Sequence, residues 1–374
     1  MKPKIWLSSP HMCGNEQHYI KEAFDSNWVA PLGPNVNGFE NDLQSYLQEK
    51  RYVAALASGT SALHLSLILL NVGRDDEVIC QSKTFSASAN PIVYQGATPI
   101  FVDSEMDTWN ICPIQLEIAI KDRISKGKKP KAIIAVHLYG MPYKVDEVHS
   151  VAKKYEIPVI EDSAESLGSH YKKQKCGTFG DLSILSFNGN KIITTSGGGA
   201  LVTRTEAQKQ KAVFLATQAR DNAPHYEHSS IGYNYRMSNI VAGIGRGQMT
   251  ILDSHVAKRR ANHELYKKSF KNIDQISFLE EPDGMFSNRW LSCILLDSEK
   301  TREHLRLNLE KENIESRPLW KPMHQQPVFK DAPRYLNGVS DDLFERGLCL
   351  PSGSNLTELE LDRVISAINT YFAV

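Results

Sequence analysis

The segment SFNGNKIITTSGGGALVT, residues 186–203, places a single lysine, Lys191, between two short apolar runs. The runs DLSILSF (181–187) and ALVT (200–203) have the composition of strands, which bury their backbone and the chain between them. An unpaired ammonium group is costly to bury, and a buried lysine tends to lose its proton. A neutral lysine amine is a nucleophile that forms Schiff bases with carbonyl compounds. The segment therefore predicts a strand, a turn and a second strand that together hold a nucleophilic lysine.

The sequence around this segment alternates apolar runs with helix-like patterns from about residue 50 to 205. Such alternation predicts a mainly parallel sheet with helices on both faces. Ligands of these sheets bind at the carboxyl ends of the strands. Three polar clusters follow predicted strands, namely ASGTS, QSKTFS and EDSAE. We expect these clusters to form the binding site.

The last third of the chain has a different pattern. It begins with a charged helix-like run, VAKRRANHELYKKSF, and ends with LTELELDRVISAINTYF, in which Thr357 and Glu360 predict a capping box. We expect a large domain over residues 1–250 and a smaller α+β domain over residues 251–374, with which the N-terminal segment can pack.

Composition excludes several classes of protein. The 374 residues include 43 basic and 43 acidic side chains, so the basic stripe typical of nucleic-acid binding is not expected. The six cysteines are scattered without a CxxC pair, which is typical of a reducing compartment. The longest aliphatic run, LHLSLILLNV, is too short to span a bilayer. We expect a cytoplasmic protein with no nucleic-acid or membrane partner.

Asp162 ends the apolar run IPVIED and allows two interpretations. It can cap a following helix. Alternatively, a carboxylate at a strand end can hold a cationic heterocycle, such as the protonated pyridine nitrogen of pyridoxal 5'-phosphate (PLP).

Two further features of the sequence are candidates for the same site. The run Ser58-Gly59-Thr60-Ser61 stands between a strand and a helix, where it forms either an ordinary helix cap or an anion site. Phe85 follows another predicted strand. A lysine, a carboxylate, an anion site and an aromatic ring together suit a phosphorylated aldehyde cofactor.

Other polar segments have less specific patterns. HYEH, residues 225–228, has no third metal ligand at a recognised spacing, so we predict no metal site. GYNYRMSN (232–239) and RPLWKPMHQQPVF (317–329) are either packed loops or surfaces that recognise phosphates and sugars.

The motifs of this chain resemble those of the DegT/DnrJ/EryC1/StrS sugar aminotransferases, which are fold-type I PLP enzymes. They run in the family's order over nearly the whole chain, as SGTSALHL, TFSAS, PIFVD, HLYG, EDSAESLGS, SFNGNK, GGGALVT, GYNYRMSN and MHQQPVF. The resemblance implies an α/β fold in which a mainly parallel seven-stranded sheet lies between helices, beside a smaller α+β C-terminal domain.

The resemblance also implies roles for individual residues around PLP. Lys191 would be the Schiff-base lysine and proton shuttle, Asp162 would face the pyridine nitrogen, and Phe85 would stack on the ring. Glu165 stands where many relatives carry Gln or His near the 3-hydroxyl group. The family's common GEGG turn is GGGA here, which departs from the pattern.

A phosphate-binding set is implied in the same way. Its members are Thr60, Ser61 and Ser186, together with Asn234, which would reach the phosphate from the second subunit of a homodimer.

The elements SSPHMCGNE, ESRPLWKPMH and CLPSGSN resemble one subgroup, the C4-aminotransferases of UDP-4-keto-6-deoxy-N-acetylglucosamine in bacillosamine-type pathways. This resemblance implies a UDP-keto-sugar acceptor and L-glutamate as amino donor. Because the chain is neutral overall, local donors must meet the nucleotide diphosphate. The candidates, which are otherwise surface ion-pairing groups, are Arg220, His225, Arg236, Arg317 and His324.

Two alternatives are a 3-keto-sugar acceptor and a PLP-fold sensor without turnover. Related sugar dehydratases carry histidine in place of the lysine, so the presence of Lys191 favours transamination.

Overall fold

The computed structural model describes residues 2–48 and 50–373. Its main feature is an eight-stranded sheet with the order β1-β9-β8-β5-β4-β2-β3-β14. The strands are β1 (Tyr52–Leu56), β2 (Glu77–Gln81), β3 (Thr98–Val102), β4 (Ala132–Val136), β5 (Val159–Asp162), β8 (Leu182–Ser186), β9 (Gly199–Thr203) and β14 (Arg334–Tyr335). Among the described strands of this sheet, β9 alone runs opposite to the others and is therefore antiparallel to both β1 and β8.

The prediction of a mainly parallel α/β sheet is thus confirmed, but the sheet has eight strands rather than seven. The additional strand, β14, comes from the last tenth or so of the chain and pairs with β3. It is two residues long, and so short a strand has no periodicity that the sequence could reveal.

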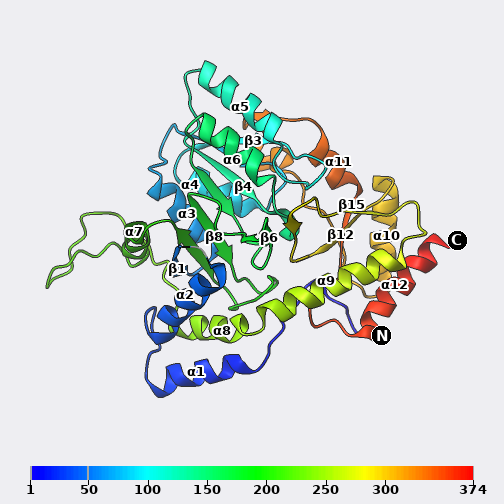
Figure 1. The fold of residues 1–374 in the computed structure, drawn as a ribbon, viewed down its shortest axis with the longest axis horizontal. Coiled ribbons are helices and arrows are strands. Elements are labelled where there is room, and N and C mark those ends of the chain that lie inside the picture. The colour runs from blue at the N-terminus through cyan, green and yellow to red at the C-terminus, as the bar shows by residue number, and fades with distance from the viewer. Residues whose placement is uncertain (1, 49, 374) are drawn as a thin grey trace.

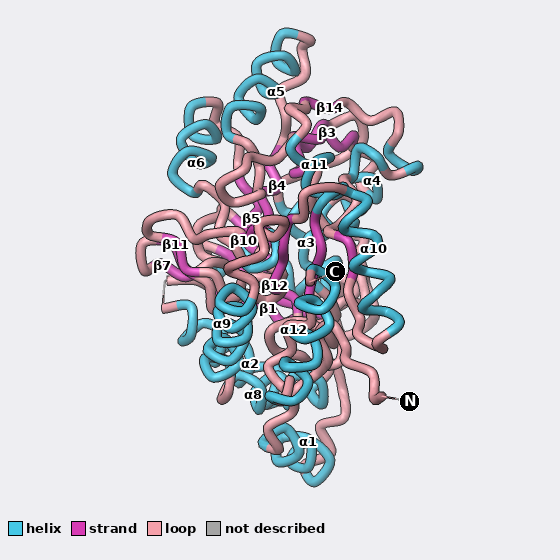
Figure 2. Tube along the Cα trace, turned by 90° about the vertical axis from the view of Figure 1, so that its right-hand side faces the viewer, coloured by secondary structure: helices cyan, strands magenta, loops and turns pink. Residues whose placement is uncertain are grey.

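Helices cover both faces of this sheet (Figures 1 and 2). Side chains alternate between the faces along each strand. One face packs against α3, α4 and α7, and the other against α2 and α8 near β1 and against α5 and α6 near β3. The bounds of these helices are α2 (Pro34–Leu47), α3 (Gly59–Leu69), α4 (Asn90–Tyr94), α5 (Pro113–Ser125), α6 (Val145–Lys154), α7 (Glu206–Ala216) and α8 (Asn239–Met249), while α1 (Asn15–Asp25) packs on α8.

A second core lies in the C-terminal part of the chain. Its antiparallel sheet has the order β10-β12-β15-β13. The elements are α9 (Leu252–Ser269), β10 (Ser277–Phe278), β12 (Ser292–Leu295), α10 (Glu299–Lys311), β13 (Arg317–Pro318), α11 (Val339–Arg346), β15 (Gly347–Leu350) and α12 (Glu358–Phe372). The N-terminal Ile5 is buried in this core and bridges to Ile314. The division of the chain near residue 250 stays a prediction.

A small three-stranded sheet joins distant segments. It consists of β6 (His170–Tyr171), β7 (Gln174–Lys175) and β11 (Met285–Phe286), with β6 in the middle. It ties the segment after β5 to the C-terminal part of the chain.

Two further features matter for the site. The loop between α7 and α8 extends away from the body of the molecule (Figure 1). Among the helices of the described residues, none combines the length and the apolar character needed to cross a membrane.

Candidate active site

A cavity of about 280 Å³ opens at the carboxyl ends of β1, β2, β5 and β8. Segments that follow these four strands line it, and they contain all three polar clusters of the sequence. Trp290 and Trp320 complete the wall from the C-terminal part of the chain. The parallel strands explain this convergence, because their carboxyl ends meet at one edge of the sheet.

Lys191 projects into this cavity from the irregular segment between β8 and β9. Its Nζ lies 3.5 Å from Oε1 of Glu165 and 4.1 Å from the centroid of the Trp290 ring. Its side chain is only 11 % exposed. The amine is therefore shielded from bulk water yet faces a cavity that Asp162 also lines.

Asp162 is the last residue of β5, and its carboxylate is buried at the cavity wall. The Ser88 hydroxyl donates to Oδ2 at 2.6 Å, and the Ala164 N–H donates to Oδ1 at 3.1 Å. Burial raises the pKa of Asp162, an effect that these hydrogen bonds partly oppose. Residues 164–168 form turns rather than a helix, so Asp162 does not cap a helix here.

Glu165 is a second buried carboxylate of the cavity. The Tyr139 N–H donates to its Oε2 at 2.6 Å, while Oε1 faces Lys191. Burial raises the pKa of Glu165 to about 7, with the Lys191 charge acting in the opposite direction.

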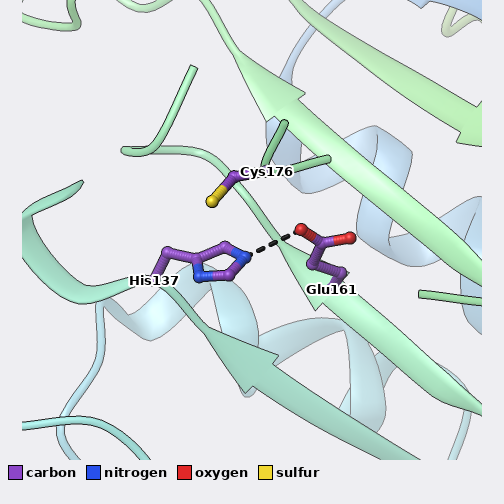
Figure 3. A group of neighbouring side chains, drawn as sticks. All are labelled: His137, Glu161 and Cys176. Carbon is purple, nitrogen blue, oxygen red and sulfur yellow. Dashed lines mark hydrogen bonds and ion pairs between the residues drawn. The ribbon is translucent and has the colours of Figure 1, made fainter. Parts of the chain in front are cut away.

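A buried histidine–glutamate pair anchors β5 just before Asp162 (Figure 3). The Tyr143 N–H donates to Nδ1 of His137, so Nε2 carries the proton and donates to Glu161 at 2.7 Å. Three backbone N–H groups and two hydroxyls also donate to the Glu161 carboxylate. Cys176 lies beside the pair, and these three side chains have ligand atoms close enough for a metal ion. Because the Glu161 oxygens are already occupied by donors, we interpret the group as a structural anchor that presents Asp162.

The N-terminus of α3 forms another part of the cavity wall, through Ser58, Gly59 and Thr60. Ser58 and Ser61 form a reciprocal capping box, and the Ser61 hydroxyl donates to the Ser58 carbonyl at 2.7 Å. Thr60 and Ser186 face the cavity, whereas Ser61 does not line it. The first N–H groups of a helix lack partners within the helix, so this end of α3 is suited to an anion.

Phe85 also lines the cavity, whereas the remaining predicted residues do not line the cavity of their own chain. Asn234, Arg220 and His225 are exposed on the projecting loop between α7 and α8. Within that loop Arg220 stacks on the Tyr226 ring and His225 pairs with Glu227.

The other three candidates have partners within the chain. Arg236 pairs with Glu40 at 2.5 Å, and Arg317 pairs with Glu315 at 2.7 Å on the surface. His324 is buried between Ser82 and Asp341. Their roles in sugar binding stay predictions.

Comparison with known proteins agrees with this geometry. Residues 10–369 match the DegT/DnrJ/EryC1/StrS aminotransferase family. The chain belongs to this family. It is 54 % identical to the "Putative pyridoxal phosphate-dependent aminotransferase EpsN" of Bacillus subtilis strain 168, over 98 % of this chain and 96 % of that protein.

Two further relatives extend the comparison. The GDP-perosamine synthase of Escherichia coli O157:H7 is 37 % identical over 99 % of both chains. The PLP form of Spr1654 from Streptococcus pneumoniae superposes with a TM-score of 0.91 at 27 % identity, covering 99 % of each chain. The protein is a PLP-dependent sugar aminotransferase of fold-type I.

The cavity of this family member fits PLP. The N-terminus of α3, with the hydroxyls of Thr60 and Ser186, suits the phosphate. The packing there is close: a Cβ on Gly199 would lie 2.3 Å from the Gly59 nitrogen, so a side chain cannot be accommodated. No cationic side chain among the described residues forms an ion pair with Asp162, which leaves its carboxylate for the ring nitrogen.

Several cavity residues were not predicted from the sequence of this aminotransferase. Ser88 lies in the TFSAS motif and Trp320 in RPLWKPMH, so both segments carried a signal, but neither residue was singled out. Tyr139, whose N–H donates to the cavity residue Glu165, lies in the HLYG motif but was likewise not singled out. Trp290 had no signal, because it comes from a segment remote in the chain that only the fold brings to the cavity.

Proposed function

We propose that the enzyme transfers the amino group of L-glutamate to C4 of a UDP-4-keto-6-deoxy-N-acetylhexosamine. The product would be UDP-4-amino-4,6-dideoxy-N-acetylglucosamine, used in bacterial glycan biosynthesis. The observation that supports transamination is a shielded lysine amine that shares one cavity with a buried, unpaired carboxylate and a helix N-terminus. The resemblance of SSPHMCGNE, ESRPLWKPMH and CLPSGSN to one subgroup supports the UDP-linked acceptor.

The chain's own groups would divide the work as follows. PLP, when bound, supplies an electron sink and carries the amino group between the two substrates. Asp162 would keep the ring nitrogen protonated, and the N-terminus of α3 would hold the phosphate. The Lys191 amine would take the proton from Cα of glutamate and later deliver a proton to C4 of the sugar. The C–N bond broken at glutamate is balanced by the one formed at the sugar, and 2-oxoglutarate leaves.

An aromatic wall would keep water from these proton transfers. The Trp320 ring lies 5.4 Å from that of Phe85 and 5.1 Å from that of Tyr139, while Trp290 lies beneath the Lys191 amine. Tyr139 also links this wall to Glu165. Its backbone N–H donates to the carboxylate, and its hydroxyl accepts from the backbone N–H of Trp320.

A GDP-linked 4-keto-sugar is a second candidate acceptor. It is favoured by the 37 % identity to a GDP-perosamine synthase over 99 % of the chain. A 3-keto-sugar is a third candidate, because the order of motifs would be much the same.

A panel of acceptors with glutamate tests these proposals. UDP-linked and GDP-linked 4-keto-6-deoxy sugars and a UDP-linked 3-keto sugar are each incubated with enzyme, and both 2-oxoglutarate and the amino sugar are quantified. We expect the highest kcat/KM for the UDP-4-keto sugar. A higher value for the GDP-linked or the 3-keto sugar would replace our assignment with that acceptor. A glutamate-induced change in the visible spectrum, without turnover of any acceptor, would favour a sensor.

A further inference from the structure

Arg259 of α9 is a buried arginine near Lys191 that lacks a carboxylate partner. Its side chain is almost wholly buried, and no described carboxylate forms an ion pair with it. Burial lowers the pKa of Arg259 to about 10, so it is charged at neutral pH. Its Nε has no hydrogen-bond partner among the described residues. A buried unpaired cation is costly, so the position requires an explanation.

Arg259 donates hydrogen bonds to two residues, Trp290 and Ser8, and both of these donate in turn to the peptide carbonyl that precedes Lys191. Nη1 donates to the Trp290 carbonyl at 2.6 Å, and Nη2 donates to the Ser8 hydroxyl at 3.0 Å. The Ser8 hydroxyl and the Trp290 indole N–H both donate to the carbonyl oxygen of Asn190, at 2.8 and 2.7 Å. The guanidinium therefore fixes this carbonyl through two groups, one of which also provides the ring beneath the Lys191 amine.

His255 holds the carbonyl of Ile192, the residue that follows Lys191. It lies four residues before Arg259, on the same face of α9. Because a carbonyl only accepts, Nδ1 of His255 donates to the Ile192 carbonyl, at 3.2 Å. The ring is buried and stacks on His11 at 4.7 Å. Burial lowers the pKa of His255 to about 4, so the ring is neutral at pH 7.

We propose that Arg259 and His255 are positioning residues that hold the two carbonyls on either side of Lys191 and so aim its amine into the cavity. The need is physical. Residues 187–198 form no regular helix or strand, and the four-carbon side chain of a lysine carries any error at its Cα to the amine. Arginine suits the position because its planar fork donates to two separate acceptors. This inference rests on the proposed role of Lys191.

The first experiment measures covalent attachment rather than turnover. Arg259→Met and Arg259→Lys are compared with Arg260→Met, a matched control in which the neighbouring arginine of α9 loses its contacts with Glu281 and the Ser287 carbonyl. Cofactor-free enzyme is mixed with PLP, and attachment to Lys191 is followed by absorbance and by borohydride trapping. The same variants in a Lys191→Ala background give the non-covalent affinity for PLP.

We expect Arg259→Met to slow attachment by about tenfold or more, since small misplacements of reacting groups have large effects on rate. The kcat should fall in parallel, while KM for glutamate and the affinity in the Lys191→Ala background stay within about twofold. Arg259→Lys should recover part of the rate. Amide hydrogen exchange of residues 188–195 should become faster in Arg259→Met and not in Arg260→Met.

Two results would overturn the proposal. The first is equal attachment rates in Arg259→Met and Arg260→Met. The second is a loss of non-covalent PLP affinity, measured for Arg259→Met in the Lys191→Ala background, as large as the loss of attachment rate. If Arg259→Met does not fold, the double variant Ser8→Ala with Trp290→Phe keeps Arg259 but removes both donors to the Asn190 carbonyl, together with the Ser8 contact of Arg259 and the indole ring beneath Lys191. An unchanged attachment rate in that variant also overturns the proposal. Trapping on another lysine in the wild-type enzyme would instead refute the proposed role of Lys191.

Discussion

At the scale of single residues, the carboxyl groups of Glu161, Asp162 and Glu165 have pKa values shifted in different directions by their surroundings. Burial would raise the pKa of Glu161, but the hydrogen bonds from His137 and from backbone N–H groups outweigh it and lower the pKa to about 2. Burial prevails at Asp162 and Glu165, which have fewer donors, and raises the pKa of both. Glu161 is therefore an ionised structural group, whereas the other two are open to the cavity and its ligands.

The substitution Asp162→Asn should separate folding from chemistry. The amide oxygen can still accept from the Ala164 N–H, and the Ser88 hydroxyl, which also contacts the Thr84 hydroxyl, can turn to accept from the amide NH2 group, so we expect a folded protein that binds PLP. Turnover should fall by about a hundredfold, because the charge that would hold the ring nitrogen protonated is lost. Steady-state assays with PLP content measured in parallel check this. Near-normal turnover would show that Asp162 only anchors the turn after β5.

The raised pKa of Glu165 predicts a pH-dependent stability of the cofactor-free enzyme. Between its usual value near 4.5 and about 7, the folded state holds a proton that the unfolded state has released. The contribution of Glu165 to stability is therefore complete below about pH 4.5 and is lost as the pH rises through about 7.

Glu165→Gln keeps a neutral polar group at every pH. Its free energy of unfolding, relative to the wild type, should thus rise by about 3 kcal/mol between pH 4 and pH 8. Urea denaturation of both proteins at the two pH values measures this. A difference that does not change with pH would contradict the assignment.

At the scale of secondary-structure elements, the sequence predicted what local patterns determine. The strand–helix alternation and the capping box of Thr357 and Glu360 are confirmed, because both depend on residues close in the chain. The strand β14 and the placement of Trp290 in the cavity were not predictable. Each is fixed by packing between segments that lie far apart in the sequence.

Helix α3 begins with a capping box, and we propose that the same end holds the cofactor phosphate; two substitutions separate these roles. Thr60→Ala should weaken PLP binding with little change in stability, because Thr60 faces the cavity. Ser61→Ala should cost about 1 kcal/mol of stability through loss of the capping box. Thermal denaturation and equilibrium dialysis against PLP measure the two effects. Equal losses of PLP affinity would show that Ser61 also binds the phosphate, as the family resemblance implies.

At the scale of the whole molecule, the loop between α7 and α8 stands apart from the compact body (Figure 1). It carries three of the predicted ligand-binding residues, Arg220, His225 and Asn234, all exposed. It also carries Tyr226 and Ile231, which are 79 % and 85 % exposed. Both lie on the same exposed loop, where a partner molecule can cover them. These features support the proposal that the loop reaches the cavity of a second copy of the chain.

Complementation between two inactive variants tests this arrangement. Lys191→Ala removes the amine, and Asn234→Ala removes the group predicted to cross to the partner's cavity. If each site combines Lys191 of one subunit with Asn234 of the other, a heterodimer of the two variants contains one intact site. Random reassembly of an equal mixture should then recover about a quarter of the wild-type activity, since half of the dimers are mixed and each has one of two sites. Separate variants unfolded and refolded alone serve as the control, and sedimentation reports the oligomeric state. A fully active monomer, or a mixture no more active than its components, would show that each chain completes its own site, and Asn234 would then have to act elsewhere than at the phosphate of a partner.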